Sequence, residues 1–456
     1  MAEMALPATA LLAPVDSKTN TTPAPETERV IESFEVSGPH ANVAEQEDIP
    51  PDGGYGWVCT ACVLLVNAST WGVNSAYGVF LAYFLSHSTF SGASRLEYAL
   101  IGGLSISQSL FISPLIGLCN EKLGTRISLL IGAMLVSVSL LASSFTTRIW
   151  QLFLSQGVCF GYGLGFLYIP ASTVLPQWFD KKRSLSMGIA SSGAGFGGLV
   201  YNLVAGAAIQ GLGWRWTYRI LAISTAVVNV TCALLLKDRN KMVKPKKQGF
   251  NVREFGHISV VLVILWGIFT ELGYIVLLYS LPDYAISIGL SANQGAVVGA
   301  VLNVGLGVGR PIIGLLSDRF GRIDTATGMS PPATALCGIF VLSLWVPAHS
   351  YAVLLLFALA IGSVTGIFWG TVAPVTAEVV GLQRLPATFG MLVLPLVIPT
   401  VFAEPIALGL AASYGYLTAK IFVGCMFLAG AASTFALRSW KLVEGEGWRS
   451  PVTAGD

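Results

Sequence analysis

Charged residues are scarce in this sequence of 456 residues. Asp, Glu, Lys and Arg make up 11% of the chain, whereas hydrophobic residues make up 54% and the mean hydropathy is +0.70. Soluble proteins carry roughly a quarter charged residues, and a globule of this size would expose much of its apolar surface to water. The formal net charge of +2 offers no basic surface to nucleic acid. The composition therefore excludes soluble enzymes and nucleic-acid-binding proteins, and it predicts a polytopic membrane protein.

Residues for metal, redox or nucleotide chemistry are also missing. The four histidines are scattered and form no cluster of metal ligands. Cys59 and Cys62 form a C-x-x-C pattern, but they lie in an apolar run and are expected to pack there. The run Gly193-x-Gly195-x-x-Gly198 has the letters of a dinucleotide fingerprint without a preceding strand. No G-x-x-x-x-G-K-[ST] motif occurs, so we expect no cofactor and no ATP-driven chemistry.

Long apolar runs begin at residue 55 and recur with short polar breaks. Runs that are long enough to cross a hydrocarbon core of roughly 30 Å must be helical, because lipid cannot satisfy the backbone polar groups. We predict an all-α protein with twelve spans, at about 57–85, 97–119, 126–145, 150–176, 184–210, 215–236, 258–282, 293–317, 327–346, 351–375, 386–411 and 416–437.

The longest polar break divides these spans into two sets of six. The linker 237–256 is rich in Lys and Arg, which predicts a cytosolic location. We therefore expect a disordered cytosolic tail (1–50), a six-helix bundle (51–236), the basic linker, a second six-helix bundle (257–438) and a cytosolic tail (439–456). The plasma membrane is the predicted location, with the vacuolar membrane as the alternative, and the predicted state is a monomer.

An internal repeat supports this division. Gly117-x-x-x-Glu121-Lys122-x-Gly124-x-Arg126 follows the second span, and Gly314-x-x-x-Asp318-Arg319-x-Gly321-Arg322 follows the eighth. Each copy places an acid beside a base at the mouth of its bundle. The pattern predicts gating loops in which the charged residues form contacts in one state and break them in another. These residues are Glu121, Lys122, Arg126, Asp318, Arg319 and Arg322.

The duplicated motif, the twelve spans and the basic central linker resemble the major facilitator superfamily. Two further stretches, 51–57 (PDGGYGW) and 178–190 (WFDKKRSLSMGIA), resemble the monocarboxylate-transporter (monocarboxylate porter) family, especially its fungal branch. The resemblance covers residues 51–438. It implies two pseudo-symmetric six-helix bundles, the movement of small carboxylates in animal members, and other cargo in fungal members.

The sequence departs from the family at two positions. Animal members carry a lysine late in the first span, where this chain has Ser75. They also carry an aspartate four residues before an Arg-Pro pair, where this chain has Leu306 before Arg310-Pro311. The arginine therefore remains without its two usual companions, which weakens the implication of lactate-type proton symport.

Three ionisable residues lie inside predicted spans. Burying such a group costs about 2.5–3.5 kcal/mol on insertion scales, so each is a candidate functional residue. Arg310 could hold a carboxylate through two parallel hydrogen bonds, or it could pair with an acid. Glu271 could carry a proton or pack as a neutral or paired side chain, and Glu404 could face a cavity or cap a helix break beside Pro405.

Polar and aromatic residues in the spans give further candidates for substrate binding. Asn67, Trp71 and Asn74 share one face of the first span, with Tyr77 close by. These residues could line the site or hydrogen-bond between helices. Tyr168, Tyr274, Tyr279 and Trp369 could add aromatic surfaces for a larger cargo or could simply pack.

Glycines at four-residue spacing predict close helix packing. Small residues at this spacing allow helices to approach and slide past one another. The set consists of Gly157, Gly161 and Gly165 in the fourth span and Gly193 and Gly197 in the fifth.

These features predict a secondary transporter that moves a small organic anion by alternating access, with or without a proton. The alternatives are an efflux protein for a larger fungal metabolite and a membrane sensor that binds a ligand without transport. The expected partners are the small molecule and the lipid bilayer, without nucleic acid. An intramembrane enzyme is not expected, because no catalytic cluster is visible in the spans.

Overall fold

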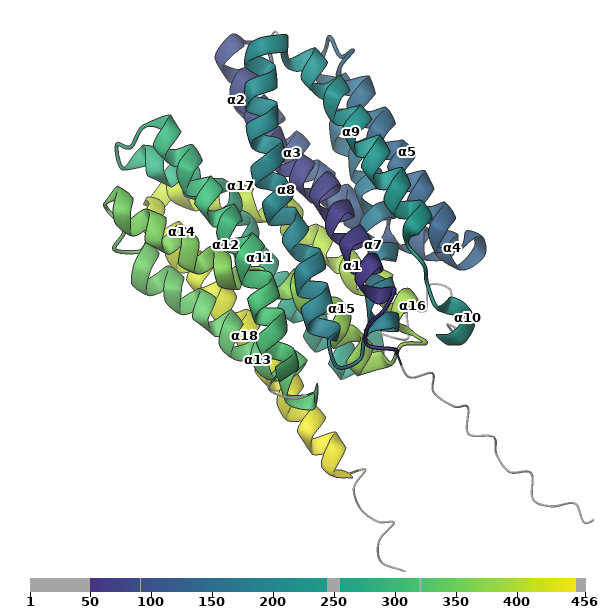
Figure 1. Ribbon diagram of the computed structural model, residues 1–456. Coiled ribbons are helices and arrows are strands. Elements are labelled where there is room, and N and C mark those ends of the chain that lie inside the picture. The colour runs from purple at the N-terminus through teal and green to yellow at the C-terminus, as the bar shows by residue number, and fades with distance from the viewer. Residues whose placement is uncertain (1–49, 91, 244–254, 320–321, 448–456) are drawn as a thin grey trace, which may run out of the picture. The chain divides into compact units, whose positions relative to one another are not determined.

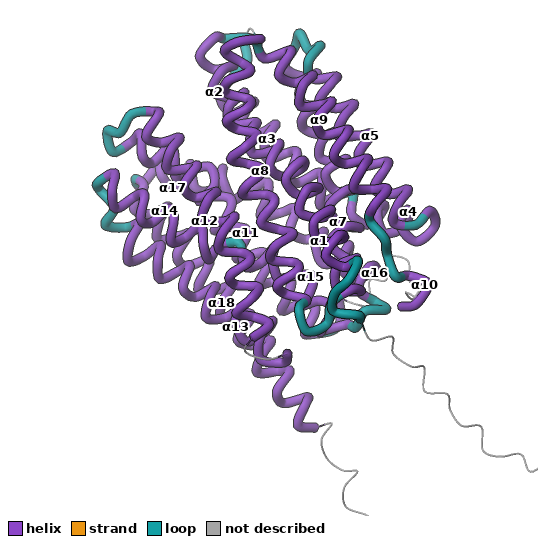
Figure 2. The backbone as a smooth tube through the Cα atoms, viewed as in Figure 1, coloured by secondary structure: helices purple, strands orange, loops and turns teal. Residues whose placement is uncertain are grey.

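The computed structural model describes residues 50–90, 92–243, 255–319 and 322–447 (Figure 1). Throughout these residues the secondary structure is helix joined by short loops (Figure 2). The predicted N-terminal tail, most of the basic linker and the last part of the C-terminal tail lie outside the described residues.

The first half of the chain contains six spans. Its helical elements are α1 (Gly56–Asn67), η1 (Ala68–Gly72), α2 (Val73–His87), α3 (Arg95–Phe111), α4 (Ser113–Leu123), α5 (Thr125–Ser143), α6 (Ile149–Leu152), η2 (Phe153–Cys159), α7 (Phe160–Trp178), α8 (Arg183–Leu212) and α9 (Trp214–Leu235). The elements α1–η1–α2, α3–α4 and α6–η2–α7 each make one span.

The second half repeats this plan after the short helix α10 (Asn240–Val243). Its elements are α11 (Ile258–Ser287), α12 (Ala292–Arg319), α13 (Arg322–Phe340), η4 (Val341–Trp345), α14 (Tyr351–Thr365), α15 (Ile367–Val380), α16 (Leu385–Val393), η5 (Leu394–Leu396), α17 (Val397–Tyr414) and α18 (Tyr416–Gly447). The prediction ended the last span near residue 437. α18 continues to Gly447, and Lys441 on this extension forms an ion pair of 3.6 Å with Glu378 of α15.

The helices account for the twelve predicted runs. Among the described residues, ten helices are long and apolar enough to cross a membrane, and α3–α4 counts as an eleventh span if this pair, bent by 46°, is taken as one. The apolar helix Met329–Trp345 is shorter and corresponds to the ninth run. The predicted all-α membrane fold is therefore confirmed.

Several spans contain a break in the regular α-helix. η1, η2 and η4 are π-helical turns, which often mark functional positions in a helix. The second span bends just before Pro114, and the tenth span breaks at Gly366 between α14 and α15. Each of these breaks interrupts the regular α-helical hydrogen bonding of its span.

The two halves meet along a few helix pairs. α8 of the first half packs along α12 of the second, and the two ribbons run side by side at the centre of Figure 1. α3 contacts α17, α4 contacts α16, and α7 contacts both α15 and α16. A hydrogen bond of 2.7 Å from Ser113 Oγ to the carbonyl oxygen of Gly390 joins α4 to α16. A site on these helices can therefore be built from both halves.

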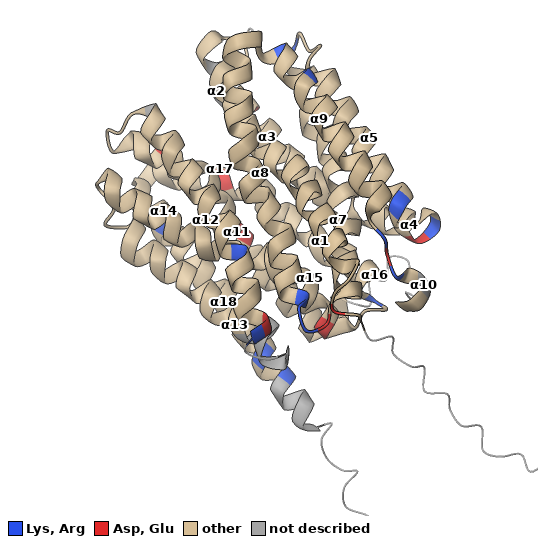
Figure 3. Cartoon of the chain, in the orientation of Figure 1, with Lys and Arg blue, Asp and Glu red and all other residues tan. Residues whose placement is uncertain are grey.

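Charged residues gather at the helix ends, with a few in the middle of the bundles (Figure 3). We call the end at which α1 begins and α18 ends the terminal face (Figure 1). The charges at mid-span are the unusual ones, because they lack water and must find partners inside the protein.

Candidate functional site

Arg310 is a buried cation at the contact between the two halves. It lies on α12, and only 5% of its surface is exposed. Its Nη1 donates a hydrogen bond of 2.7 Å to the carbonyl oxygen of Ser191 on α8, whereas its Nε has no partner. One bond to a neutral carbonyl leaves much of the guanidinium without the anion that it would bind best.

The helix break at Gly366 makes room for this guanidinium. A Cβ atom at Gly366 would overlap Nε of Arg310 and would also crowd its Cγ and Cδ. The Arg310 side chain therefore lies directly against the backbone where α14 ends and α15 begins. This close approach requires glycine for its lack of a side chain, since the local φ of −73° and ψ of 2° are open to alanine as well.

We expect Gly366→Ala to displace the guanidinium and to weaken the binding of an anion at Arg310. A hydrogen bond to a charged group contributes about 1.5–3 kcal/mol, so the loss should be roughly tenfold to a hundredfold. Half-saturation for carboxylate uptake is the measurement. Gly370→Ala is the matched control, because a Cβ there would lie 3.6 Å from Ser191 Oγ in ordinary contact. Equal affinities for the two variants would contradict the assigned position of Arg310.

Glu271 on α11 is an acid that interacts with the charge of Arg310. Its exposed fraction is 1%, and its Oε1 atom has no hydrogen-bond partner. Its carboxyl interacts with the side chain of Trp369 and with the charge of Arg310. In the part of the chain that the structure describes, however, no direct ion pair joins Glu271 to Arg310. Tyr274, one turn further along α11, also interacts with Arg310. The two charges are therefore close but not neutralised by contact.

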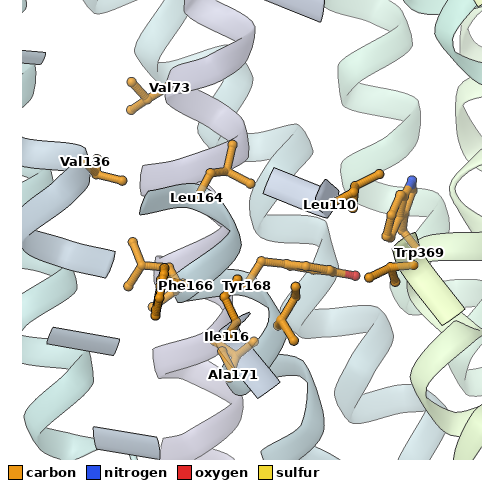
Figure 4. Close-up of a cluster of buried hydrophobic side chains, with 14 of the residues drawn as sticks. Val73, Leu110, Ile116, Val136, Leu164, Phe166, Tyr168, Ala171 and Trp369 are labelled. Carbon is orange, nitrogen blue, oxygen red and sulfur yellow. The ribbon is translucent and has the colours of Figure 1, made fainter. Parts of the chain in front are cut away.

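Three aromatic rings lie beside this pair. Trp71 of η1, Tyr168 of α7 and Trp369 of α15 have ring centroids 5.6–6.0 Å apart. Figure 4 shows the Tyr168 side chain directed toward Trp369. Tyr168 and Trp369 are 4% and 8% exposed, and Tyr168 interacts electrostatically with both Arg310 and Glu271. We call these three rings together with Arg310, Glu271 and Tyr274 the central site.

The central site contains several buried polar atoms without partners. Besides Arg310 Nε and Glu271 Oε1, these are the Tyr168 hydroxyl and the Oγ of the adjacent Ser172. Each unsatisfied buried group costs about 1–3 kcal/mol. A site that leaves donors and acceptors unpaired among aromatic rings is suited to a small ligand that satisfies them.

The other polar residues predicted in the first span are paired with neighbouring helices. Asn67 donates a hydrogen bond of 3.0 Å to the carbonyl oxygen of Ala190 on α8. Asn74 accepts one of 2.7 Å from Ser105 on α3, and the Tyr77 hydroxyl donates one of 2.9 Å to the carbonyl oxygen of Tyr98. Trp71 alone of this predicted set reaches the aromatic cluster.

Ser75, which stands where animal members of the family carry a lysine, is also paired with a neighbouring helix. Ser75 accepts a hydrogen bond of 3.3 Å from Asn202 on α8, and Leu306 is buried. Neither residue adds a charge to the central site.

Glu404 lies on α17, near a second acid, Asp283 of α11. Its Oε1 accepts a hydrogen bond of 2.9 Å from Ser280 of α11, and its Oε2 has no partner. It interacts with the charge of Asp283, whose carboxylate is hydrogen-bonded by Tyr416. The structure therefore separates Glu404 from the Arg310–Glu271 pair.

The glycines chosen for their spacing lie at close helix contacts. A Cβ atom at any of them would come within 3 Å of a neighbouring helix. Gly157, Gly161 and Gly165 face α3, and Gly193 and Gly197 face α1 and η1. Other glycines lie at close contacts between the two halves. Gly188 of α8 lies against the carbonyl oxygen of Arg310 on α12, and Gly314 of α12 lies against the carbonyl oxygen of Ser184 on α8.

The two copies of the repeated motif make different contacts on the terminal face. Asp318 accepts hydrogen bonds of 3.0 and 2.7 Å from the backbone amides of Ser184 and Leu185, where α8 begins. In the first copy, Arg126 donates a bond of 2.7 Å to the carbonyl oxygen of Leu234 within its own half. Among the described residues, the second copy therefore links the halves through its acid, an arrangement that also suits the positive end of a helix dipole.

The remaining described side chains of the motif are exposed at the surface. Glu121, Lys122 and Arg319 are exposed, and Arg322 begins α13 with its side chain outside the described residues.

The two stretches that carry the family resemblance contact each other. Asp52 accepts hydrogen bonds of 2.6 and 2.7 Å from the backbone amides of Asp180 and Lys181, in the loop between α7 and α8. Trp57 packs on Phe179 with ring centroids 4.9 Å apart. These stretches therefore fasten the start of the first span to the loop before α8 on the terminal face.

Three contributors to the central site had no signal in the sequence. Ser191 acts through its backbone carbonyl, Gly366 acts through the absence of a side chain, and Ser172 is one of many serines in the spans. Their roles depend on which helices meet, and residue type alone carries no information on that.

Comparisons with known proteins identify the family of the chain. The Major Facilitator Superfamily model matches residues 59–346. The chain is 36% identical over 413 residues to the uncharacterized transporter ESBP6 of Saccharomyces cerevisiae, covering 87% of this chain and 61% of that protein. It is 34% identical to the probable transporter MCH2 of the same yeast, covering 87% and 85% of the two chains. The chain thus spans less than two thirds of ESBP6 but most of MCH2.

More distant relatives and a solved structure complete the comparison. Monocarboxylate transporter 10 of Danio rerio and the agnestins efflux protein AgnL12 of Paecilomyces divaricatus are each 27% identical, over 79% and 80% of this chain and 74% and 83% of their own lengths. The proton:xylose symporter XylE has the same fold, with a TM-score of 0.68, 16% identity, and coverage of 85% of this chain and 99% of its own. The chain is a multi-pass membrane transporter that belongs to the Major Facilitator Superfamily, with monocarboxylate-type transporters among its relatives.

Proposed function

We propose that this transporter moves a small organic anion by alternating access, and that Arg310 binds the carboxylate of its cargo. The observation that carries the proposal is the unpaired Nε of a buried guanidinium that lies where α8 and α12 meet. A planar guanidinium can hold a carboxylate through two parallel hydrogen bonds. Within the described part of the chain, its hydrogen bond to the first half goes to a neutral carbonyl, which a charged ligand can replace or supplement.

The location of Arg310 also supports a link between binding and movement. The residue belongs to the second half, and its Nη1 bond reaches the first half at Ser191. A ligand that bridges the guanidinium and the rings of Trp71 and Tyr168 would bind both halves at once. It would therefore bind more tightly to one arrangement of the halves than to another, which is what a ligand needs in order to shift an equilibrium between two states.

A proton could accompany the anion. Glu271 is buried beside Arg310 and has an unpaired oxygen, so it is the residue in the central site that could accept one. Glu404 is the corresponding candidate outside the central site. The positive charge of the linker favours cytosolic termini. The proposed location is the plasma membrane, with the vacuolar membrane as the alternative.

A second candidate function is the export of a larger metabolite. The likeness to an agnestins efflux protein and the three-ring cluster favour it. Ser75 stands where animal members carry a lysine that meets the substrate carboxylate, and Leu306 stands where they carry an aspartate, so this chain lacks both charges.

Counterflow in proteoliposomes tests transport itself. Liposomes that contain the purified full chain are loaded with an unlabelled carboxylate, and uptake of the labelled compound is followed, using propanoate and 3-phenylpropanoate as probes. A transporter is expected to accumulate label transiently above the level in protein-free liposomes. Binding of a probe without counterflow would favour a sensor and contradict the proposal.

A further inference from the structure

Basic and aromatic side chains meet on the terminal face of the first half, where α1 begins, α7 ends and the linker begins. In three pairs, a cationic group lies over an aromatic ring, an arrangement that stabilises the cation. The pairs, with the distance from the cationic group to the ring centroid, are Lys182 and Trp57 (5.9 Å), Lys237 and Tyr55 (4.3 Å), and Arg239 and Trp178 (5.7 Å). We call these six residues the basic–aromatic surface.

Hydrogen bonds hold the start of the linker on this surface. The indole Nε1 of Trp178 donates a bond of 2.8 Å to the carbonyl oxygen of Lys237. The Tyr55 hydroxyl donates one of 2.7 Å to the carbonyl oxygen of Leu235, and the rings of Tyr55 and Trp178 have centroids 5.9 Å apart. The first residues of the linker are therefore fixed against the ends of α1 and α7. A surface that is ordered in advance loses less conformational entropy when a ligand binds.

The acidic residues of the same segments are engaged elsewhere. Asp52 accepts hydrogen bonds from three backbone amides of the loop between α7 and α8, the shortest of them 2.6 Å. Asp180 forms an ion pair of 3.6 Å with Arg183. Asp238 accepts a bond of 3.4 Å from the backbone amide of Asn240. These contacts leave the lysines of the surface without a carboxylate partner.

The two lysines present their charge to the surroundings. Lys182 and Lys237 are exposed, and no ion pair is recorded for either within the described residues. Trp57 and Val58, in the first turn of α1, are exposed as well. Tryptophan is enriched where a bilayer meets water, and α1 begins the first span. The surface therefore offers two ammonium groups beside apolar side chains at the edge of the membrane.

We propose that the basic–aromatic surface binds the headgroup of an anionic phospholipid. The ammonium groups of Lys182 and Lys237 attract the negative headgroup, and Trp57 and Val58 contact the upper part of its acyl chains. A lysine ammonium is a compact point charge that binds phosphate in many orientations. This inference goes beyond the proposed function, because the surface lies on the terminal face and contains no residue of the central site.

A phospholipid fits this surface better than a soluble anion. A soluble phosphate can contact the ammonium groups, but it leaves the side chains of Trp57 and Val58 uncovered. A lipid satisfies the same charges and also covers this apolar area, which is favourable in proportion to the area removed from water. The neighbouring apolar side chains therefore decide between the two sources of a phosphate group.

Lipid retention by the purified full chain tests the inference. The protein is delipidated in detergent and titrated with phosphatidylserine, or with phosphatidylcholine of the same acyl chains, and bound lipid is counted by native mass spectrometry. Phosphatidylserine is expected to bind at least roughly tenfold more tightly, because each basic residue near a membrane surface contributes roughly fivefold. The preference should shrink at high ionic strength, since exposed charges are screened by salt.

Variants of the two lysines separate this surface from the rest of the chain. Lys182→Gln and Lys237→Gln should each lower the preference for phosphatidylserine roughly fivefold, and the double variant should lower it roughly twenty-five-fold. Lys237→Arg keeps the charge and should retain the preference. Arg319→Gln is the matched control and should also retain it, because Arg319 is an exposed cation of the same face on α12, in the second half. Melting temperatures without added lipid establish that the variants are folded.

Three results would overturn the inference. Equal retention of the two lipids would mean that the surface does not distinguish headgroup charge. An unchanged preference in the double variant would place the lipid elsewhere on the chain. Equally tight binding of glycerophosphoserine, the headgroup without acyl chains, would identify a site for soluble anions. None of these measurements involves transport, so their outcome leaves the proposed role of Arg310 to its own test.

Discussion

Arg310→Ala is expected to lower carboxylate uptake by at least about a hundredfold without preventing membrane insertion. Two charge-assisted hydrogen bonds contribute about 3 kcal/mol or more, and a factor of one hundred corresponds to about 2.7 kcal/mol. Initial rates of uptake in proteoliposomes, normalised to the amount of folded protein, provide the measurement. Insertion should be preserved because the substitution removes a buried charge rather than adding one.

Two further variants sharpen this prediction. Arg310→Lys keeps the charge but loses the planar fork, so an intermediate loss is expected. Arg215→Ala is the control, because Arg215 is placed over the ring of Trp214 on α9, far along the chain from the central site. Uptake by Arg310→Ala at the rate of Arg215→Ala would remove Arg310 from the binding site.

Enlarging Gly188 is expected to abolish transport for a mechanical reason. A Cβ atom at Gly188 of α8 would overlap the backbone carbonyl oxygen of Arg310 on α12, and a backbone atom cannot move aside as a flexible side chain can. Overpacking of this kind costs about 1–3 kcal/mol. Gly188→Ala should lower the melting temperature, and Gly188→Val should stop transport, because α8 and α12 are the pair of helices along which the halves pack.

Gly206→Ala provides the comparison on the same helix. A Cβ atom at Gly206 would meet nothing within 4 Å, so this variant should transport normally and gain up to about 1 kcal/mol of helix stability. If Gly188→Val and Gly206→Val had equal melting temperatures and transport rates, the close α8–α12 contact would not be important for function.

The fold was largely predictable because lipid acts as a simple solvent. Runs of about 20 apolar residues must be helical in a membrane, and the positions of the runs follow from hydropathy alone. The breaks within spans were less visible. The bend before Pro114 has a recognisable cause, whereas the π-helical turns at η1 and η2 and the break at Gly366 depend on neighbouring helices.

The charged residues of the central site could be predicted from the sequence. Arg310 and Glu271 stood out because a charge in an apolar span is costly and needs a reason. The structure brings them together with Trp71, Tyr274 and Trp369 from the predicted set.

Neutral polar residues were harder to place. Asn67, Asn74 and Tyr77 share a helix face with Trp71, but each finds a partner on an adjacent helix. A sequence gives the spacing of residues along a helix but not the rotation of that helix against its neighbours. Lining of the site and hydrogen bonding between helices could therefore not be distinguished from the sequence.

The most direct test is a structure of the full chain with a transported carboxylate bound. The account predicts that both carboxylate oxygens lie within hydrogen-bond distance of the Arg310 guanidinium, between α8 and α12 and beside the rings of Trp71 and Trp369. A carboxylate bound elsewhere, with the Arg310 side chain still satisfied only by the carbonyl oxygen of Ser191, would contradict the account.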